Sequence, residues 1–262
     1  MEIIRPSAVA GLFYPADTDT LNHIIANELD KSVSSTPLTP KALIVPHAGY
    51  VYSGAIAASA YRYLKPLKHT ISRVVLIGPS HRVPFDGLAV SGADWFETPL
   101  GLVAVDRHAS SSIMSIEGVH VLEHAHAREH SLEVQLPFLQ YLLDDFKIVP
   151  VVAGHASPQL VAQVLESLWG GPETLIVVSS DLSHYLNYDT AREIDAETSE
   201  AIINLDNHLI DGYHACGSVG INGLLLYARR HQLHGQVLDL RNSGDTAGKK
   251  DSVVGYGAYL FN

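Results

Sequence analysis

Four short runs of consecutive apolar residues are spaced along the first two thirds of the chain. They are rich in Val, Ile and Leu and occupy residues 41–45, 73–77, 147–152 and 174–178. Apolar runs of this length, without polar alternation, are typical of strands buried on both faces, as in a parallel sheet. The pattern therefore predicts four core strands.

Segments with apolar residues at helical spacing lie between and after these runs. From Leu132 to Leu143, for example, leucines recur every three or four positions, which predicts an amphipathic helix. The predicted helices cover residues 18–31, 54–64, 131–143, 158–169, 189–205 and 221–231. Strands that alternate with helices favour an α/β fold with a largely parallel central sheet flanked by helices, formed as a single domain over residues 1–262.

Shorter segments complete this prediction. Residues 88–91 and 101–105 suggest a small antiparallel excursion, and residues 236–240 and 253–261 suggest late strands. Residues 32–40 are rich in Ser, Thr and Pro, so we expect a loop after the first helix.

Composition narrows the class of protein. Hydrophobic residues make up 47% of the 262, which is enough for a large core. The formal net charge is -11 and no basic run occurs, so we expect no nucleic-acid partner and no membrane partner, since both attract clustered cations. Cys216 is the single cysteine, the first residues do not show a cationic region followed by an apolar one as in a signal peptide, and no apolar run approaches about 18 residues. We expect a cytoplasmic protein.

Histidines follow two of the predicted strands directly. His47 comes after the first apolar run and His81 after the second. In open α/β sheets ligands bind beyond the carboxyl ends of the strands. Two histidines and one carboxylate form a ligand set that suits Fe(II) and also Zn. The alternative is that each histidine hydrogen-bonds to backbone groups of its loop.

Three carboxylates are candidates for the same site. Asp245, in the loop over residues 242–245, is either a metal ligand or a turn former. Asp181 lies three residues before His184, so the two could share a helical face as a general acid/base pair, the alternative being a helix N-cap beside a surface histidine. Glu133, with His130, either faces the pocket or belongs to the start of a helix, and the pattern favours the helix start.

Other histidines and the cysteine give weaker signals. His124 and His126 alternate with alanine, which favours a loop, and His155 ends the third predicted strand. Cys216 is a nucleophile, a soft ligand or a small buried apolar residue, and a lone cysteine favours the last.

Several motifs, taken in order, resemble the Memo family, also called AmmeMemoRadiSam system protein B. They read RPSAVAGLFYP, VPHAGY, GPSH, EHSLE, SSD, CG and VVGY and occupy residues 5–15, 45–50, 78–81, 129–133, 179–181, 216–217 and 253–256. These motifs extend over nearly the whole chain. The resemblance implies a fold similar to that of the LigB-like class III extradiol dioxygenases, which use non-haem iron.

The resemblance also implies roles for individual residues. His47 and His81 match the family's two histidine ligands, and His184, accompanied by Asp181, matches the place of an acid/base histidine. The last ligand is a cysteine in the animal branch, and residues 242–246 contain none, so we expect Asp245 in its place. His155 matches no motif, and Cys216 is taken to match a motif position other than the ligand one.

These implications lead to an expected function. We expect a divalent metal, Fe(II) first and Zn or Cu as alternatives, in a dioxygenase-like redox enzyme, with Tyr52, His130 and Glu133 binding a small-molecule or peptide ligand. The resemblance further implies a modification system with radical-SAM and AMMECR-type proteins as partners. Two alternatives stay open: a non-catalytic binding module that uses the same pocket, and a Zn-dependent hydrolase.

Overall fold

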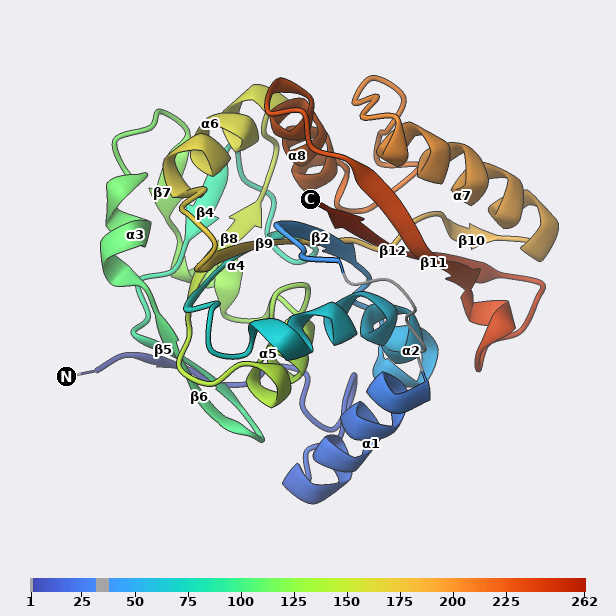
Figure 1. Ribbon diagram of the computed structural model, residues 1–262, viewed down its shortest axis with the longest axis horizontal. Helices are drawn as coiled ribbons and strands as arrows, with labels where there is room; N and C mark the ends of the chain where they lie inside the picture. Colours follow the sequence, from blue (N-terminus) through green and yellow to red (C-terminus); the bar gives the residue numbers. More distant parts are fainter. Residues whose placement is uncertain (1, 32–37) are drawn as a thin grey trace.

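The computed structural model describes residues 2–31 and 38–262, and these residues build one broad mixed sheet with helices on both faces (Figure 1). The strands follow the order β1-β5-β6-β8-β3-β9-β2-β12-β10, with β11 beside β12, β4 beside β8 and β7 beside β4. Their bounds are β1 (Ile4–Arg5), β2 (Ala42–Val45), β3 (Arg73–Pro79), β4 (Leu88–Val90), β5 (Trp95–Thr98), β6 (Gly101–Val105), β7 (Val119–Val121), β8 (Lys147–Ala153), β9 (Thr174–Ser179), β10 (His184–Leu186), β11 (Gly235–Asn242) and β12 (Val253–Phe261).

The centre of this sheet is parallel. Val75 of β3 is in register with Val149 of β8 on one side and with Ile176 of β9 on the other, and β2 continues the parallel order beyond β9. Antiparallel pairing involves the flanking strands: β12 pairs with β2, β10 and β11, β5 and β6 form a hairpin, and β4 pairs with β8. The predicted α/β fold with a largely parallel central sheet is confirmed.

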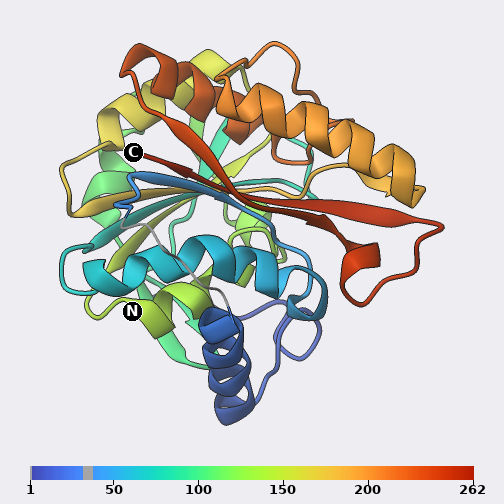
Figure 2. The ribbon, with the colours of Figure 1, turned by 45° about the vertical axis from the view of Figure 1, so that its right-hand side comes forward.

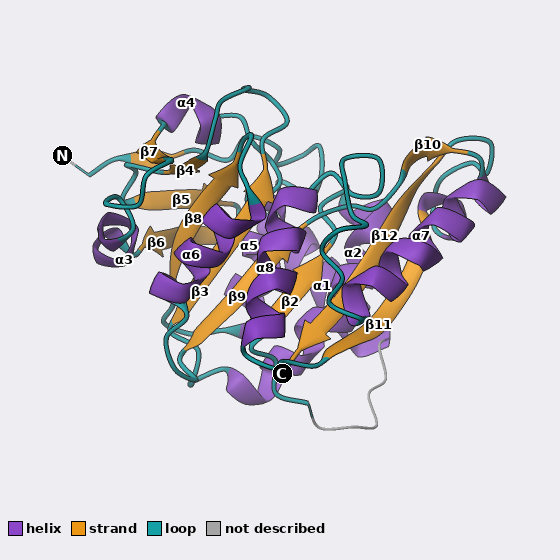
Figure 3. Cartoon of the chain, turned by 90° about the horizontal axis from the view of Figure 1, so that it is seen from above, coloured by secondary structure: helices purple, strands orange, loops and turns teal. Residues whose placement is uncertain are grey.

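Helices cover the two faces as separate layers (Figures 2 and 3). The helices are α1 (Thr18–Lys31), α2 (Tyr50–Tyr61), α3 (Arg107–Ser112), α4 (Glu123–His126), α5 (Leu136–Leu142), α6 (Pro158–Leu168), α7 (Tyr188–Ile203) and α8 (Ser218–Arg230). Side chains alternate along β3, so that Val74 and Leu76 belong to the core cluster that contains residues of α1, α2 and α5, while Val75 and Ile77 belong to the cluster that contains residues of α6 and α8. A strand with both faces covered must be apolar throughout, which is why the core strands were visible in the sequence.

The structure departs from the predicted elements in several places. The second helix begins earlier than expected, at Tyr50, and ends in the 3-10 turn η1 (Arg62–Leu67). The helix predicted over residues 131–143 is split into the 3-10 turn η2 (Glu133–Gln135) and α5, in which Pro137 occupies the first turn, where its missing N–H costs nothing.

The predicted antiparallel excursion is also arranged differently. Residues 101–105 pair with β5, whereas β4 pairs with β8. Within the loop predicted over residues 32–40, residues 32–37 lie outside the described residues. No described helix is both long enough and apolar enough to cross a membrane.

Candidate metal centre

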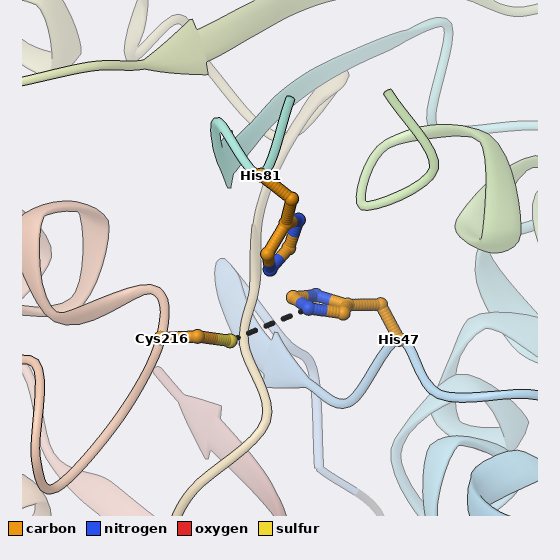
Figure 4. Close-up of side chains that lie close together, drawn as sticks. All are labelled: His47, His81 and Cys216. Atoms are coloured by element: carbon orange, nitrogen blue, oxygen red, sulfur yellow. Dashed lines mark hydrogen bonds between the residues drawn. The ribbon is translucent and has the colours of Figure 1, made fainter. Parts of the chain in front are cut away.

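Three ligand-type side chains from distant segments converge at the carboxyl edge of the sheet (Figure 4). His47 follows β2, His81 follows β3, and Cys216 lies just before α8. One ligand atom of each lies within 4.8 Å of the others, and His47 Nε2 is 3.3 Å from Cys216 Sγ. Strands β2 and β3 both flank β9, so their ends open onto the same space.

His47 is held in a fixed orientation inside the protein. Its backbone N–H donates to Asp181 Oδ1 at 2.7 Å, and its Nδ1 lies 2.9 Å from Ser179 Oγ. The residue is 1% exposed. Burial, helped by the neighbouring His81, lowers the pKa of His47 to about 3, so the imidazole is neutral at pH 7, the form that binds metals.

His81 is oriented by a buried carboxylate. Glu129 accepts from the backbone N–H of His81 at 2.6 Å and from its Nδ1 at 2.9 Å, and further accepts from the amides of His130 and Ser131. Burial alone would raise the pKa of Glu129, but the hydrogen bonds from His81 and from the backbone amide of Ser131 outweigh it and lower the pKa to about 2. An ionised carboxylate on Nδ1 leaves Nε2 of His81 free, as in many metal-binding histidines.

Cys216 completes the group. Its Sγ accepts from the backbone N–H of Asp181 at 3.3 Å, and burial raises the pKa of the thiol to about 12. At neutral pH the side chain of Cys216 is thus a protonated thiol, and its Sγ faces the Nε2 atom of His47. The sequence favoured a small buried apolar role for Cys216; in the structure its side chain is partly buried and its Sγ belongs to a group of three possible ligand atoms.

Asp245, the carboxylate expected as third ligand, lies elsewhere. It is exposed and ends the 3-10 turn η3 (Ser243–Asp245), where its carboxylate accepts from the backbone N–H of Asn242 at 3.0 Å and from the hydroxyl of Tyr188. Residues 2–31 and 38–262 contain two groups of clustered ligand atoms, one of His47, His81 and Cys216 and one of His81, Glu129 and His130, and Asp245 belongs to neither. Capping its own turn satisfies this carboxylate, so the structure does not join it to His47 and His81.

A pocket of about 720 Å³ opens above the two histidines. Four other side chains singled out in the sequence line it: Tyr52, His130, Asp181 and His184. The ring of His130 stacks on that of His81, with centroids 4.6 Å apart. Burial, together with His47, lowers the pKa of His130 to about 4, so this imidazole too is neutral.

The Asp181–His184 pair is built differently from the prediction. His184 begins strand β10, not a helix, so the two residues do not share a helical face. Asp181 is buried, and burial raises the pKa of its carboxyl group. Its carboxylate holds the amide of His47, and it faces the same pocket as His184 without a direct hydrogen bond to it among the described residues.

Glu133, expected to bind substrate, is instead a structural anchor. The residue is fully buried, forms an ion pair with Arg5, and accepts from the amides of Ala8 and Val9 and from the hydroxyl of Tyr14. These contacts fasten the first residues of the chain to η2. Since its oxygens are all engaged in the interior, the prediction that it lines the pocket was wrong.

The remaining histidines lie outside the pocket. His124 and His126 belong to α4, not to a loop, and His126 is buried with Nε2 3.0 Å from the carbonyl oxygen of Ala89. His155 is exposed and forms an isolated bridge with Asp86.

A buried carboxylate supports the segment that carries His184. Asp195, 2% exposed, accepts from the backbone N–H of Ser183 at 3.0 Å. Burial raises the pKa of Asp195 to about 6. Because the pKa of an unfolded aspartate is about 3.9, the native state holds the proton more tightly, and stability falls as pH rises from about 4 through about 6.

We expect Asp195→Asn to remove this part of the pH dependence. The amide keeps an oxygen for Ser183 but never ionises. The free energy of unfolding of the wild type, relative to the variant, should decrease by up to about 3 kcal/mol between about pH 4 and about pH 7.5. Denaturant unfolding at both pH values measures it, and parallel stability curves for the two proteins would contradict the role of burial at Asp195.

Comparison with known proteins gives matches over nearly the whole chain. A family model described as Memo-like protein matches residues 5–260. A protein of Ignicoccus hospitalis named MEMO1 family protein is 37% identical over 285 aligned residues, which cover 99% of each chain. Proteins with the same family name from Aquifex aeolicus and Methanosarcina barkeri are 35% and 36% identical, each over 98% of this chain and 99% of the relative.

Proposed function

The chain belongs to the Memo family, and from this premise we propose that it is a metal-dependent protein whose ion is held by His47, His81 and Cys216. One observation carries the proposal: donor atoms of His47, His81 and Cys216, from three distant segments, lie within 4.8 Å of one another, and the two histidines also line the pocket. Clusters of this kind, with each imidazole fixed by a partner on its other nitrogen, are typical of metal sites.

The donor atoms suit a transition metal. Two neutral imidazoles and one sulfur are ligands that Zn, Cu and Fe accept. The sulfur makes the set differ from the two-histidine, one-carboxylate set expected from the sequence, and it strengthens Zn and Cu as alternatives to Fe(II). A bound ion would supply Lewis acidity or a redox couple beside the pocket.

The chain's own side chains have separate tasks in this proposal. Glu129 and Asp181 hold the two ligand histidines in place. His184 lines the pocket beside them, and an imidazole in that position can donate or accept a proton during reaction of a bound molecule. Tyr52 and His130 offer ring faces and polar atoms for a small molecule or the end of a peptide.

The proposed chemistry is redox, of a dioxygenase-like kind. The test uses protein prepared without oxygen and then loaded separately with Fe(II), Cu or Zn. With a suitable substrate, we expect oxygen uptake by the protein loaded with a redox-active ion, Fe(II) or Cu, and none by the protein loaded with Zn. If the Zn-loaded protein hydrolyses esters or amides and no form takes up oxygen, the protein is a Zn-dependent hydrolase and the redox proposal is wrong. If the metal-free protein binds radical-SAM and AMMECR-type proteins, and His47→Ala does not change this binding, the result favours a non-catalytic binding module.

Glu129 gives a test of the metal site that needs no substrate. We expect Glu129→Gln to weaken Zn²⁺ binding about 10–100-fold, because the charged partner of His81 Nδ1 is lost. Competition with a chromophoric chelator measures the affinity. Glu166→Gln is the control, since Glu166 is an exposed residue that pairs with His231, away from the candidate ligands. Equal affinities for Glu129→Gln and the wild type would contradict the role of Glu129.

A further inference from the structure

A buried chain of hydrogen bonds runs behind His47, on the side away from Cys216. Gln135 of η2 is fully buried, and its Nε2 donates to the carbonyl oxygen of Pro46 at 2.9 Å and to Ser179 Oγ at 2.7 Å. Its Oε1 accepts from the hydroxyl of Tyr61 at 2.9 Å. Because the Pro46 carbonyl can only accept, the amide of Gln135 has one orientation.

The orientation of the Ser179 hydroxyl proton then follows from its neighbours. Ser179 Oγ lies 2.6 Å from the carbonyl oxygen of Ser131, which can only accept, so the single hydroxyl proton points there. One oxygen lone pair takes the N–H of Gln135. The second faces Nδ1 of His47 at 2.9 Å, and the hydroxyl has no proton left to give to that nitrogen.

We infer that Gln135 and Ser179 are positioning residues that fix His47 as its Nδ1–H tautomer and so present the lone pair of Nε2 to the metal. The inference rests on the proposed metal function, but the tautomer itself belongs to the metal-free protein. His47 Nε2 points at Cys216 Sγ, on the side where the ion would bind. A metal binds only a ring nitrogen without a proton, so the wrong tautomer would have to be reversed before binding.

The two ligand histidines are therefore fixed by different means. His81 has a charged carboxylate on Nδ1, whereas His47 has a neutral hydroxyl whose own donors and acceptors are all used. Ser179 and Gln135 are fully buried, so the side chains themselves, and not bulk water, set the direction of each bond.

The test combines a tautomer measurement with metal affinity. Long-range ¹H–¹⁵N spectra of metal-free protein report which ring nitrogen of His47 carries the proton, with His47→Gln to assign the signals. We expect Nδ1–H in the wild type and a loss of this preference in Ser179→Ala, together with about 10–100-fold weaker Zn²⁺ binding. Ser179→Thr keeps a hydroxyl and should retain both properties.

The matched control is Ser53→Ala. Ser53 is also buried and donates one hydrogen bond, to the carbonyl oxygen of Ala48, rather than to the ring of His47 or His81. We expect the tautomer of His47 and the Zn²⁺ affinity to be unchanged in this variant. An Nε2–H tautomer in the wild type would overturn the inference without any variant having to fold. Nδ1–H in a wild type that fails to bind Zn²⁺ would support the tautomer assignment and overturn the proposed metal function instead.

Discussion

Cys216→Ala will lose tightly bound metal, whereas Asp245→Ala will keep it. Cys216 Sγ lies within 4.8 Å of the ligand atoms of His47 and His81, and Asp245 is engaged in capping its own turn. Removal of a direct ligand should weaken Zn²⁺ binding by more than the 10–100-fold that is roughly the effect of losing an orienting partner. Chelator competition and elemental analysis of the purified variants measure the difference.

Cobalt substitution sharpens this comparison. A thiolate bound to Co²⁺ adds an intense charge-transfer absorption, so its band should be present in the wild type and in Asp245→Ala and absent from Cys216→Ala. The opposite result, in which Asp245→Ala loses the metal and Cys216→Ala retains it, would restore the ligand set expected from the sequence alone.

Glu133→Ala should destabilise the fold by about 3–5 kcal/mol, because it leaves the buried Arg5 charge without its partner. The amides of Ala8 and Val9 and the hydroxyl of Tyr14 lose their acceptor at the same time. The free energy of unfolding in denaturant measures the loss, and metal stoichiometry of the remaining folded protein should be unchanged.

Glu166→Ala serves as the control for this prediction. Its carboxylate is exposed at the surface, so the change in stability should stay within about 0.5 kcal/mol. A Glu133→Ala protein that is as stable as the wild type, yet impaired in ligand binding, would return Glu133 to the pocket role first predicted for it.

The fold could be predicted because the apolar residues that make each core strand are consecutive in the sequence. A strand covered on both faces, such as β9 with all of its residues buried, must be a continuous apolar run. The positions of His47 and His81 followed from the same rule, since each comes directly after such a strand. The end of α2 and the division of the helix predicted over residues 131–143 into η2 and α5 depend on individual prolines and tertiary contacts. The hydrophobic periodicity of the sequence did not reveal these two features.

The third candidate ligand could not be found in this way, because tertiary packing brings it to the site. Gly217 lets the segment before α8 approach β9: a Cβ there would lie 2.6 Å from Ser180 Cβ, and its N–H donates to Ser180 Oγ at 2.9 Å. The CG motif at residues 216–217 was the only signal in the sequence. Asp245 was expected as the third ligand and Glu133 as a residue that binds the substrate, and the hydrogen bonds that each carboxylate forms in the structure show that both are engaged elsewhere.

An anomalous-scattering map from crystals loaded separately with iron, copper and zinc tests the central claim most directly. We expect one peak, at the absorption edge of the loaded metal, in contact with His47 Nε2, His81 Nε2 and Cys216 Sγ. A peak bound through Asp245, or none at these three atoms at any of the edges, would contradict it.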